Sequence, residues 1–295
     1  MMLKIEHLCK SFGSKRVLDD LNLEVADSSI FGLVGINGAG KSTLLRLIAG
    51  VYEADAGSIT LHGADTSAEP LTRREIAFVP DEAYYPVGST VGSMKLLYET
   101  MYSFSEEDFR KYLTLFELDE KMSITNLSKG MKRRVSLLFA LSVKPKLLLL
   151  DEAYDGLEPL ARLRFKKALS TLIEDEGLTV IISSHNLREL EDICDSFGIL
   201  EGGKIVSYGD LLESKDMINK YQLAFAEEKS REDFSELDLL HYEQEGRVSK
   251  LVIRGSQEEV LEKLGEMKPL LTDVLPVSFE ELFIYELESR GESHE

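Results

Sequence analysis

The sequence predicts an α/β protein with a parallel sheet, an antiparallel β subdomain, a helical insertion and a small α+β appendage. Residues 147–150 and 180–183 are short, continuous apolar runs separated by a helical pattern at 160–173. Such runs are typical of strands that are buried on both faces and joined by crossover helices. A series of strand patterns in the first sixty residues predicts the antiparallel part.

The elements follow one another in a clear order. Strand patterns at 3–8, 17–25, 30–34 and 58–62 are separated by turns, and one helix, at 41–50, interrupts them. From about residue 90 to residue 143 the apolar residues have helical spacing instead. We therefore expect the helical part, over about residues 85–143, to be inserted between the strands of the parallel sheet.

The composition changes after residue 212. Residues 213–295 carry 10 basic and 21 acidic side chains, so this part holds −11 of the net charge of −19. It retains a strand pattern at 248–254 and amphipathic helix patterns at 258–267 and 279–287. We expect two domains: residues 1–212, and an acidic α+β accessory domain at 213–295.

Charge and composition exclude several classes of function. A net charge of −19 over 295 residues repels phosphate backbones, so nucleic acid is not expected as a general partner. The two cysteines, Cys9 and Cys194, have no metal or redox spacing, which excludes a disulfide framework and fits a reducing cytosol. We find neither a secretory signal pattern nor a segment near the roughly 20 apolar residues of a spanning helix. If the protein works at a membrane, something other than a spanning helix of this sequence must anchor it.

A phosphate-binding motif follows the strand pattern at 30–34. The stretch Gly35-Ile36-Asn37-Gly38-Ala39-Gly40-Lys41-Ser42 fits G-x-x-x-x-G-K-[ST] and opens a helix, which is the context that the motif requires. Backbone N–H groups and the helix N-terminus then face phosphate oxygens, while Lys41 reaches the β and γ phosphates and Ser42 binds Mg²⁺. The alternative is a glycine-rich turn before a core helix. The predicted nucleotide-binding residues here are Gly35, Asn37, Gly38, Ala39, Gly40, Lys41, Ser42 and Thr43.

Two carboxylates end the apolar run at 147–150. Asp151 suits the Mg²⁺ shell of a phosphate-loop enzyme, and Glu152 is placed to act as general base toward an attacking water. Ligands of open α/β sheets bind at this end of the strands. The alternative is a strand terminus with two solvated acids, which is weaker beside a phosphate loop.

Two further motifs complete a family pattern. Leu127-Ser128-Lys129-Gly130-Met131 lies between the phosphate loop and the acidic pair, and Ser183-Ser184-His185 follows both. With these, residues 3 to about 212 resemble the ATP-binding cassette (ABC) ATPases, a phosphate-loop NTPase fold. The resemblance implies ATP and Mg²⁺ as cofactors. It also implies a head-to-tail dimer in which each ATP contacts the phosphate loop of one chain and the Leu-Ser-x-Gly signature of the other.

The resemblance assigns roles to further residues. Ser128 and Gly130 would bind the γ-phosphate across the dimer, although Ser128 can equally be an ordinary helix N-cap. His185 would contact the γ-phosphate and join Lys41 and Glu152 in catalysis; otherwise it is a structural histidine. Phe12 resembles the aromatic residue that stacks on adenine, where the alternative is a core position.

In the signature, Lys129 and Met131 replace the family's commoner glycine and glutamine, and two further departures matter more. Asp81 stands where the family has a glutamine that links Mg²⁺ to the membrane partner, and we expect it to contact Mg²⁺ directly or through water. Glu158 stands where an aspartate is usual, in a loop that touches the dimer interface. Hydrolysis remains the expectation, because the phosphate-loop, acidic and histidine residues are all present.

The resemblance implies a separate integral membrane permease as partner, and a dimer of this chain or of this chain with a related ATPase subunit. Tyr84, Tyr85 and Tyr98 are candidate anchors for the permease, unless they pack inside the helical subdomain. The tail resembles extensions on ATPases of bacterial ABC-2 type exporters. We therefore expect an export ATPase, peripheral on the cytoplasmic face of the membrane. A regulatory ATP-binding protein and a soluble ABC protein uncoupled from transport are the alternatives.

Overall fold

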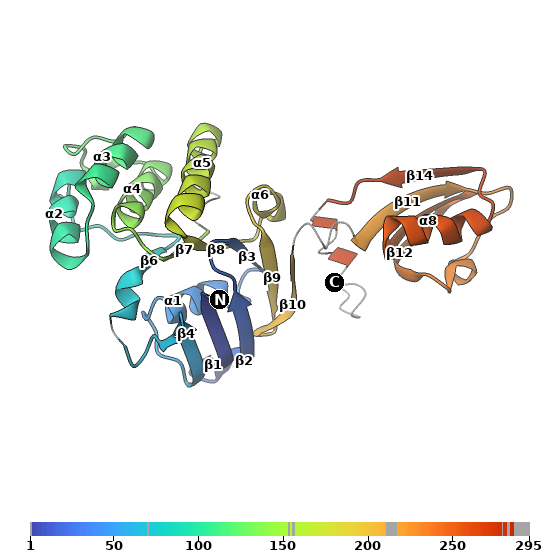
Figure 1. The fold of residues 1–295 in the computed structure, drawn as a ribbon, viewed down its shortest axis with the longest axis horizontal. Coiled ribbons are helices and arrows are strands. Elements are labelled where there is room, and N and C mark those ends of the chain that lie inside the picture. Colours follow the sequence, from blue (N-terminus) through green and yellow to red (C-terminus); the bar gives the residue numbers. More distant parts are fainter. Residues whose placement is uncertain are drawn as a thin grey trace. The chain divides into compact units, whose positions relative to one another are not determined.

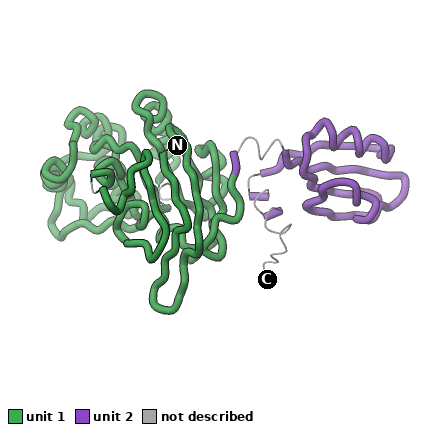
Figure 2. Tube along the Cα trace, turned by 60° about the horizontal axis from the view of Figure 1, so that its bottom comes forward, with its two compact units in different colours: residues 1–208 green, residues 209–295 purple. Residues whose placement is uncertain are grey.

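The computed structural model describes residues 2–69, 71–152, 154, 157–210, 217–278, 280–281 and 284–285. The chain divides into two compact units, residues 1–208 and 209–295, which Figure 2 shows in green and purple. The expected division, between residues 212 and 213, falls within a segment, 211–216, that lies outside the described residues.

A six-stranded sheet forms the centre of the first unit. Its strand order is β10-β9-β3-β8-β7-β6, and β6, β7, β8, β3 and β9 pair in parallel. All side chains of β3, β7 and β8 are buried, which explains their continuous apolar sequences. The predicted α/β class is confirmed. The strands are β3 (Ile30–Val34), β6 (Ile76–Val79), β7 (Leu147–Asp151), β8 (Thr179–Ser184), β9 (Ser196–Glu201) and β10 (Lys204–Asp210).

An antiparallel sheet of order β2-β1-β4-β5 packs on the same core. Leu3 of β1 lies opposite Val25 of β2 and Leu61 of β4. Helix α1 (Lys41–Ile48) lies between this sheet and the central one, and its leucines share one apolar cluster with both (Figure 1). The strands are β1 (Leu3–Phe12), β2 (Lys15–Val25), β4 (Ala56–Leu61) and β5 (Ala64–Asp65), and a short 3-10 helix, Thr72–Glu75, precedes β6.

The helical insertion lies between β6 and β7 in the sequence, as predicted. Its helices begin at hydroxyl caps, Thr90, Ser105 and Ser128, each of which accepts a hydrogen bond from a backbone N–H three residues on. Phe109 and Phe139 are fully buried at its centre. The elements are α2 (Val91–Met101), α3 (Glu106–Leu115), a 3-10 helix (Ile124–Asn126) and α4 (Lys129–Ser142), followed after β7 by α5 (Pro159–Glu176) and after β8 by α6 (Leu187–Glu191).

The second unit is an α+β fold with its own core. Its sheet has the order β12-β13-β11-β14, and Tyr221, Leu251 and Leu264 belong to a separate apolar cluster. Strand β13 coincides with the predicted strand, whereas the predicted helix at 279–287 lies mostly outside the described residues. The elements are β11 (Ile218–Ala224), a 3-10 helix (Arg231–Phe234), β12 (Asp238–Glu245), β13 (Val248–Arg254), α8 (Gln257–Glu266) and β14 (Leu271–Leu275).

Across the described part of the chain, none of the helices combines the length and the apolar character needed to cross a membrane.

Candidate nucleotide-binding site

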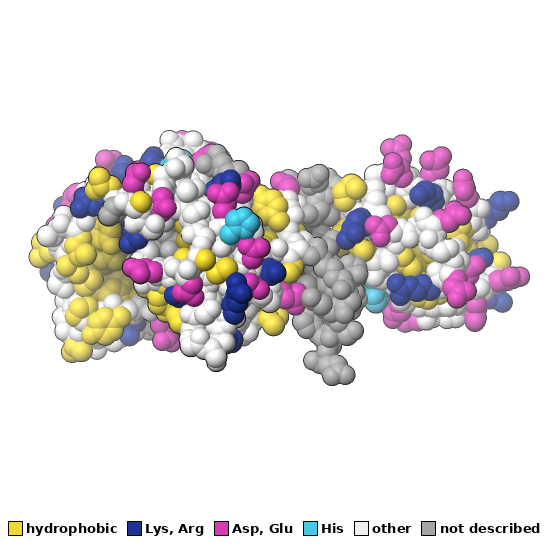
Figure 3. Space-filling view, turned by 90° about the horizontal axis from the view of Figure 1, so that it is seen from below, with side chains coloured by type: hydrophobic (Ala, Val, Ile, Leu, Met, Phe, Trp, Pro, Cys, Tyr) yellow, Lys and Arg dark blue, Asp and Glu magenta, His cyan; other side chains and the backbone are white. Residues whose placement is uncertain are grey.

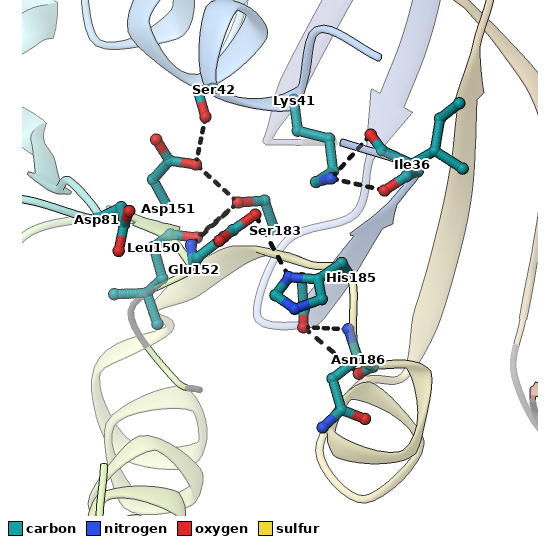
Figure 4. Close-up of polar contacts among 12 residues, drawn as sticks. Ile36, Lys41, Ser42, Asp81, Leu150, Asp151, Glu152, Ser183, His185 and Asn186 are labelled. Carbon is teal, nitrogen blue, oxygen red and sulfur yellow. Dashed lines mark hydrogen bonds and ion pairs between the residues drawn. The ribbon is translucent and has the colours of Figure 1, made fainter. Parts of the chain in front are cut away.

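The phosphate-binding loop connects β3 to α1, and glycine is required at two of its positions. Gly40 has φ +113°, a conformation that other residues rarely adopt. A Cβ on Gly35 would lie 2.6 Å from the carbonyl oxygen of Leu200. The Lys41 Nζ donates to the carbonyl oxygens of Gly35 at 2.6 Å and Ile36 at 3.3 Å, so the ammonium group lies folded over the loop (Figure 4).

The remaining loop residues lie where the motif predicts them. Asn37 and Gly38 are exposed at the tip of the loop, while Ala39 is partly buried. Ser42 and Thr43 are half-buried in the first turn of α1. The loop therefore presents its tip and the positive end of a helix together, an arrangement that favours a bound phosphate group.

Three hydrogen-bonding side chains meet at the carboxyl ends of β7 and β8. Asp151 Oδ1 accepts from the Ser42 Oγ at 2.9 Å and from the Ser183 Oγ at 2.9 Å (Figure 4). Asp151 is only 1% exposed, and its second oxygen, Oδ2, has no hydrogen-bond partner among the described residues. A buried carboxylate with an unpaired oxygen is costly unless a cation compensates it.

This donor set fits Mg²⁺. Carboxylate and hydroxyl oxygens are hard ligands of the kind that Mg²⁺ prefers, and Ser42 and Asp151 provide one of each. The unpaired Asp151 Oδ2 offers a direct or water-mediated contact. Ser42 and Asp151, two of the three predicted metal ligands, are thus brought together.

Glu152 and His185 lie beside this cluster. The Glu152 backbone has φ +49°, and its N–H donates to the Ser183 backbone oxygen at 3.1 Å and to the Ser183 Oγ at 3.2 Å. Its Oε1 lies 3.5 Å from His185 Nδ1, and the His185 side chain is 53% exposed. The predicted base and the predicted histidine therefore form a pair at the edge of the site.

Phe12, the predicted adenine-stacking residue, is not a core side chain. It is 45% exposed at the end of β1. Tyr52 meets its ring edge-on with centroids 5.4 Å apart, and the Lys10 Nζ lies 5.5 Å from its centroid. The ring is thus held by its neighbours while a large part of it remains accessible.

Ser128 caps the signature helix α4. Its Oγ accepts from the Met131 N–H at 3.2 Å, so the N-cap interpretation holds within one chain. Gly130 lies in the first turn of the same helix, next to the end that attracts anions.

Asp81, the third predicted metal ligand, has different partners. Its Oδ1 lies 2.6 Å from the Arg133 guanidinium and 3.2 Å from the Lys129 ammonium. Burial acts to raise the pKa of Asp81, but hydrogen bonds from Lys129 and Arg133 outweigh it and the pKa is lowered. No contact joins Asp81 to Ser42 or Asp151 among the contacts described for this part of the chain (Figure 4).

The contacts of two further residues were not predicted from the sequence. Ser183 connects Asp151 to Glu152, and Arg133 holds Asp81. The available signal for Ser183 was a hydroxyl at the end of a strand next to the one carrying Asp151. For Arg133 the signal was its place in a basic run at the start of α4, Lys129, Lys132, Arg133 and Arg134.

Comparisons with known proteins agree with this geometry. A family model described as ABC transporter matches residues 18–155. The ABC transporter ATP-binding protein YtrB of Bacillus subtilis (strain 168) is 30% identical over 96% of this chain and 97% of its own length, so the similarity reaches into the second unit. The lantibiotic transport ATP-binding protein SrtF of Streptococcus pyogenes is 33% identical over 70% of this chain and 89% of its own length.

A solved structure, the ATP binding subunit of an ABC transporter, is 29% identical with a TM-score of 0.68, over 73% of this chain and 92% of that one. The extent and identity of these matches, together with the phosphate loop and the acidic strand end, place the chain in one family. The chain belongs to the ABC transporter ATPases, as an ATP-binding subunit.

Proposed function

We propose that this subunit hydrolyses ATP with Mg²⁺ held by Ser42 and Asp151, and that it powers a separate membrane permease. The observation that carries the proposal is the buried Asp151 carboxylate, which hydroxyl groups hold in place and whose Oδ2 is unpaired among the described residues. Bound there, Mg²⁺ would supply positive charge to the phosphate oxygens.

The proposed roles of the other residues follow from their positions. Lys41 exchanges its contacts with the loop carbonyls for phosphate oxygens, which are stronger acceptors. Glu152 accepts a proton from the water that attacks the γ-phosphorus, and the bond to the β-γ bridging oxygen breaks to release phosphate. His185, 3.5 Å from the Glu152 carboxylate, orients that carboxylate and contacts the γ-phosphate. Phe12 stacks on the adenine.

We propose a head-to-tail dimer as the active state. The α4 N-terminus, with Ser128 as cap and Gly130 in the first turn, is a helix end that attracts anions. In the dimer this end faces the phosphate loop of the second chain, so each ATP is enclosed by both chains.

The permease is proposed to bind a groove of about 490 Å³ between β6 and the helical insertion, lined by Tyr84, Tyr85, Tyr98 and Tyr102 among others. Tyr84 is 85% exposed, whereas Tyr85 donates to or accepts from Ser136 at 2.7 Å and Tyr98 stacks on Phe139. Leu96, Leu97 and Met101 of α2, the helix that carries Tyr98, are also exposed, and Figure 3 shows hydrophobic side chains gathered at this end of the unit.

Export is the proposed direction of transport. SrtF serves lantibiotic transport, and the lipopolysaccharide export system ATP-binding protein LptB of Haemophilus influenzae is 34% identical over 70% of this chain. Bound to its permease, the subunit would be peripheral on the cytoplasmic face of the membrane.

Phosphate release from the purified protein tests this function. We expect release that requires Mg²⁺ and falls at least 100-fold in Glu152→Gln, because the amide cannot accept the proton. ATP binding without release by the wild type would instead establish the regulatory, non-hydrolysing alternative. Co-purification with a candidate polytopic membrane protein, lost on Tyr84→Asp, would test the coupling to transport.

A further inference from the structure

Arg133 is a charged side chain buried in the signature helix. Its side chain is only 4% exposed, and the Arg133 Nη2 donates to two oxygens of one residue, the Asp81 carbonyl at 2.8 Å and the Asp81 Oδ1 at 2.6 Å. A buried guanidinium without a counter-charge is strongly destabilising, so this pairing is a structural requirement of the fold.

The same Asp81 oxygen has a second cationic partner. The Lys129 Nζ lies 3.2 Å from it, and Lys129 and Arg133 are four residues apart on α4, hence on one face of the helix. Lys129 directly follows the cap Ser128. Asp81 therefore holds the first two turns of α4, through Lys129 in the first and Arg133 in the second, next to the residues that would contact a nucleotide across the dimer.

A weaker contact lies on the neighbouring residue. The Arg134 Nη2 donates to Glu158 Oε2 at 2.8 Å, with Glu158 80% exposed. Asp81 and Glu158, two of the positions where the sequence departs from the family, thus pair with consecutive arginines of α4. Both of these acidic residues therefore contact the same helix.

We propose that Asp81 is a positioning residue for the signature: it ties the first turn of α4 to the end of β6 and so sets where Ser128 and Gly130 meet the nucleotide of the opposite chain. The inference rests on the proposed function, because positioning matters only if α4 completes the site of a second chain. It assigns Asp81 to the helix and leaves the metal to Ser42 and Asp151.

Steady-state phosphate release by Asp81→Asn tests the role. We expect kcat to fall about tenfold, while the KM for ATP and the Mg²⁺ concentration for half-maximal rate stay within twofold, because the phosphate loop and Asp151 are unchanged. Asp81→Glu, which keeps the charge, should recover at least a third of the wild-type kcat. A tenfold rise in the Mg²⁺ requirement would make Asp81 a metal ligand, and an unchanged kcat would remove its role; either result overturns the inference.

Glu106→Gln is the matched control. Glu106 is as exposed as Asp81, at 43% against 41%, and it also pairs with two cations, Lys95 at 2.7 Å and Arg110 at 2.8 Å, but all three lie within α2 and α3. This variant should keep kcat within twofold of the wild type. A loss equal to that of Asp81→Asn would show that any broken ion pair in the insertion has the effect, and would overturn the inference.

Hydrogen exchange separates this inference from the proposed function. In Asp81→Asn the amides of Met131 and Lys132, which bond to Ser128, should exchange at least tenfold faster than in the wild type and in Glu106→Gln. Should Asp81→Asn fail to fold, Lys129→Met, at a 65% exposed side chain, should show a smaller increase at the same amides. Unchanged exchange in the variant measured refutes the positioning role, whether or not the wild type hydrolyses ATP; a wild type without hydrolysis refutes the proposed function alone.

Discussion

The ends of β6 and β7 carry two aspartates with opposite surroundings. At the end of β7, Asp151 is buried among hydroxyl groups, and its charge meets no cation among its described contacts. After β6, Asp81 is partly exposed and two cations compensate it. Hydroxyl neighbours orient a carboxylate without neutralising its charge, so the carboxylate can still bind a cation. Basic neighbours neutralise the charge, so the carboxylate instead connects two parts of the fold.

The largest expected effect comes from Asp151→Asn. Phosphate release should fall at least 100-fold, because the amide cannot compensate a divalent cation. In the absence of Mg²⁺ and nucleotide, however, the variant should be more stable by about 1–2 kcal/mol, since an uncompensated buried charge is removed while both hydroxyl contacts persist. Thermal unfolding with and without Mg²⁺ measures this. A variant less stable than the wild type without Mg²⁺ would show that the charge is compensated within the chain.

The same substitution at Asp81 should change the stability of the protein in the opposite direction. Asp81→Asn should lower the free energy of unfolding by about 1–3 kcal/mol, because the buried Arg133 loses its counter-charge. Chemical denaturation of both variants side by side makes the comparison. If both substitutions changed the free energy of unfolding in the same direction, the distinction between the two strand ends would be contradicted.

Ser183→Ala should have a smaller effect. It removes the 2.9 Å hydrogen bond to Asp151 Oδ1 and the Oγ contact of the Glu152 N–H, worth about 1 kcal/mol. We expect a severalfold lower kcat, because Asp151 is less firmly oriented. Ser170→Ala, on the exposed side of α5, is a control that removes a serine hydroxyl bonded only to its own helix. An activity equal to that of the wild type would show that Ser42 alone orients Asp151.

The smallest effect is expected at a carboxylate of the second unit. Hydrogen bonds from Lys220 and Ser278 lower the pKa of Glu281 against the effect of burial. Because the pKa is lowered in the folded protein, the charged carboxylate stabilises the fold at any pH above its ordinary pKa of 4.5. This contribution is lost as the pH falls through the lowered pKa. The unfolding midpoint of residues 209–295 within the full chain should fall on acidification, less steeply in Glu281→Gln. Equal pH dependence in both proteins would count against this.

The sequence predicted the parts of the site that are contiguous. The phosphate loop and the acidic strand end each carry their context within a few residues, and both lie where they were expected. The partners of Asp81 were not predictable, because the contact with Arg133 spans 52 residues and depends on how α4 packs beside β6. Aligning Asp81 with a metal-contacting position suggested a metal ligand, and only the packing reveals the two cations.

In the fold as a whole, too, the elements with a local sequence pattern were predictable and those that depend on packing were not. Buried strands such as β7 and β8 are evident from their apolar runs, whereas β11 and β14 of the second unit mix polar and apolar residues and were not predicted. Leu96, Leu97 and Met101 have helical spacing, but the sequence could not show that this apolar face of α2 is exposed.

The left-handed backbone conformation of Glu152 means that selection for stability alone can remove this carboxylate. Glycine or asparagine adopts φ +49° with less strain than glutamate, by about 1 kcal/mol. A library of variants sorted only for soluble, heat-resistant protein will therefore enrich such residues at position 152. The selected variants will be soluble and stable, but they will lack the carboxylate on which the proposed ATP hydrolysis depends.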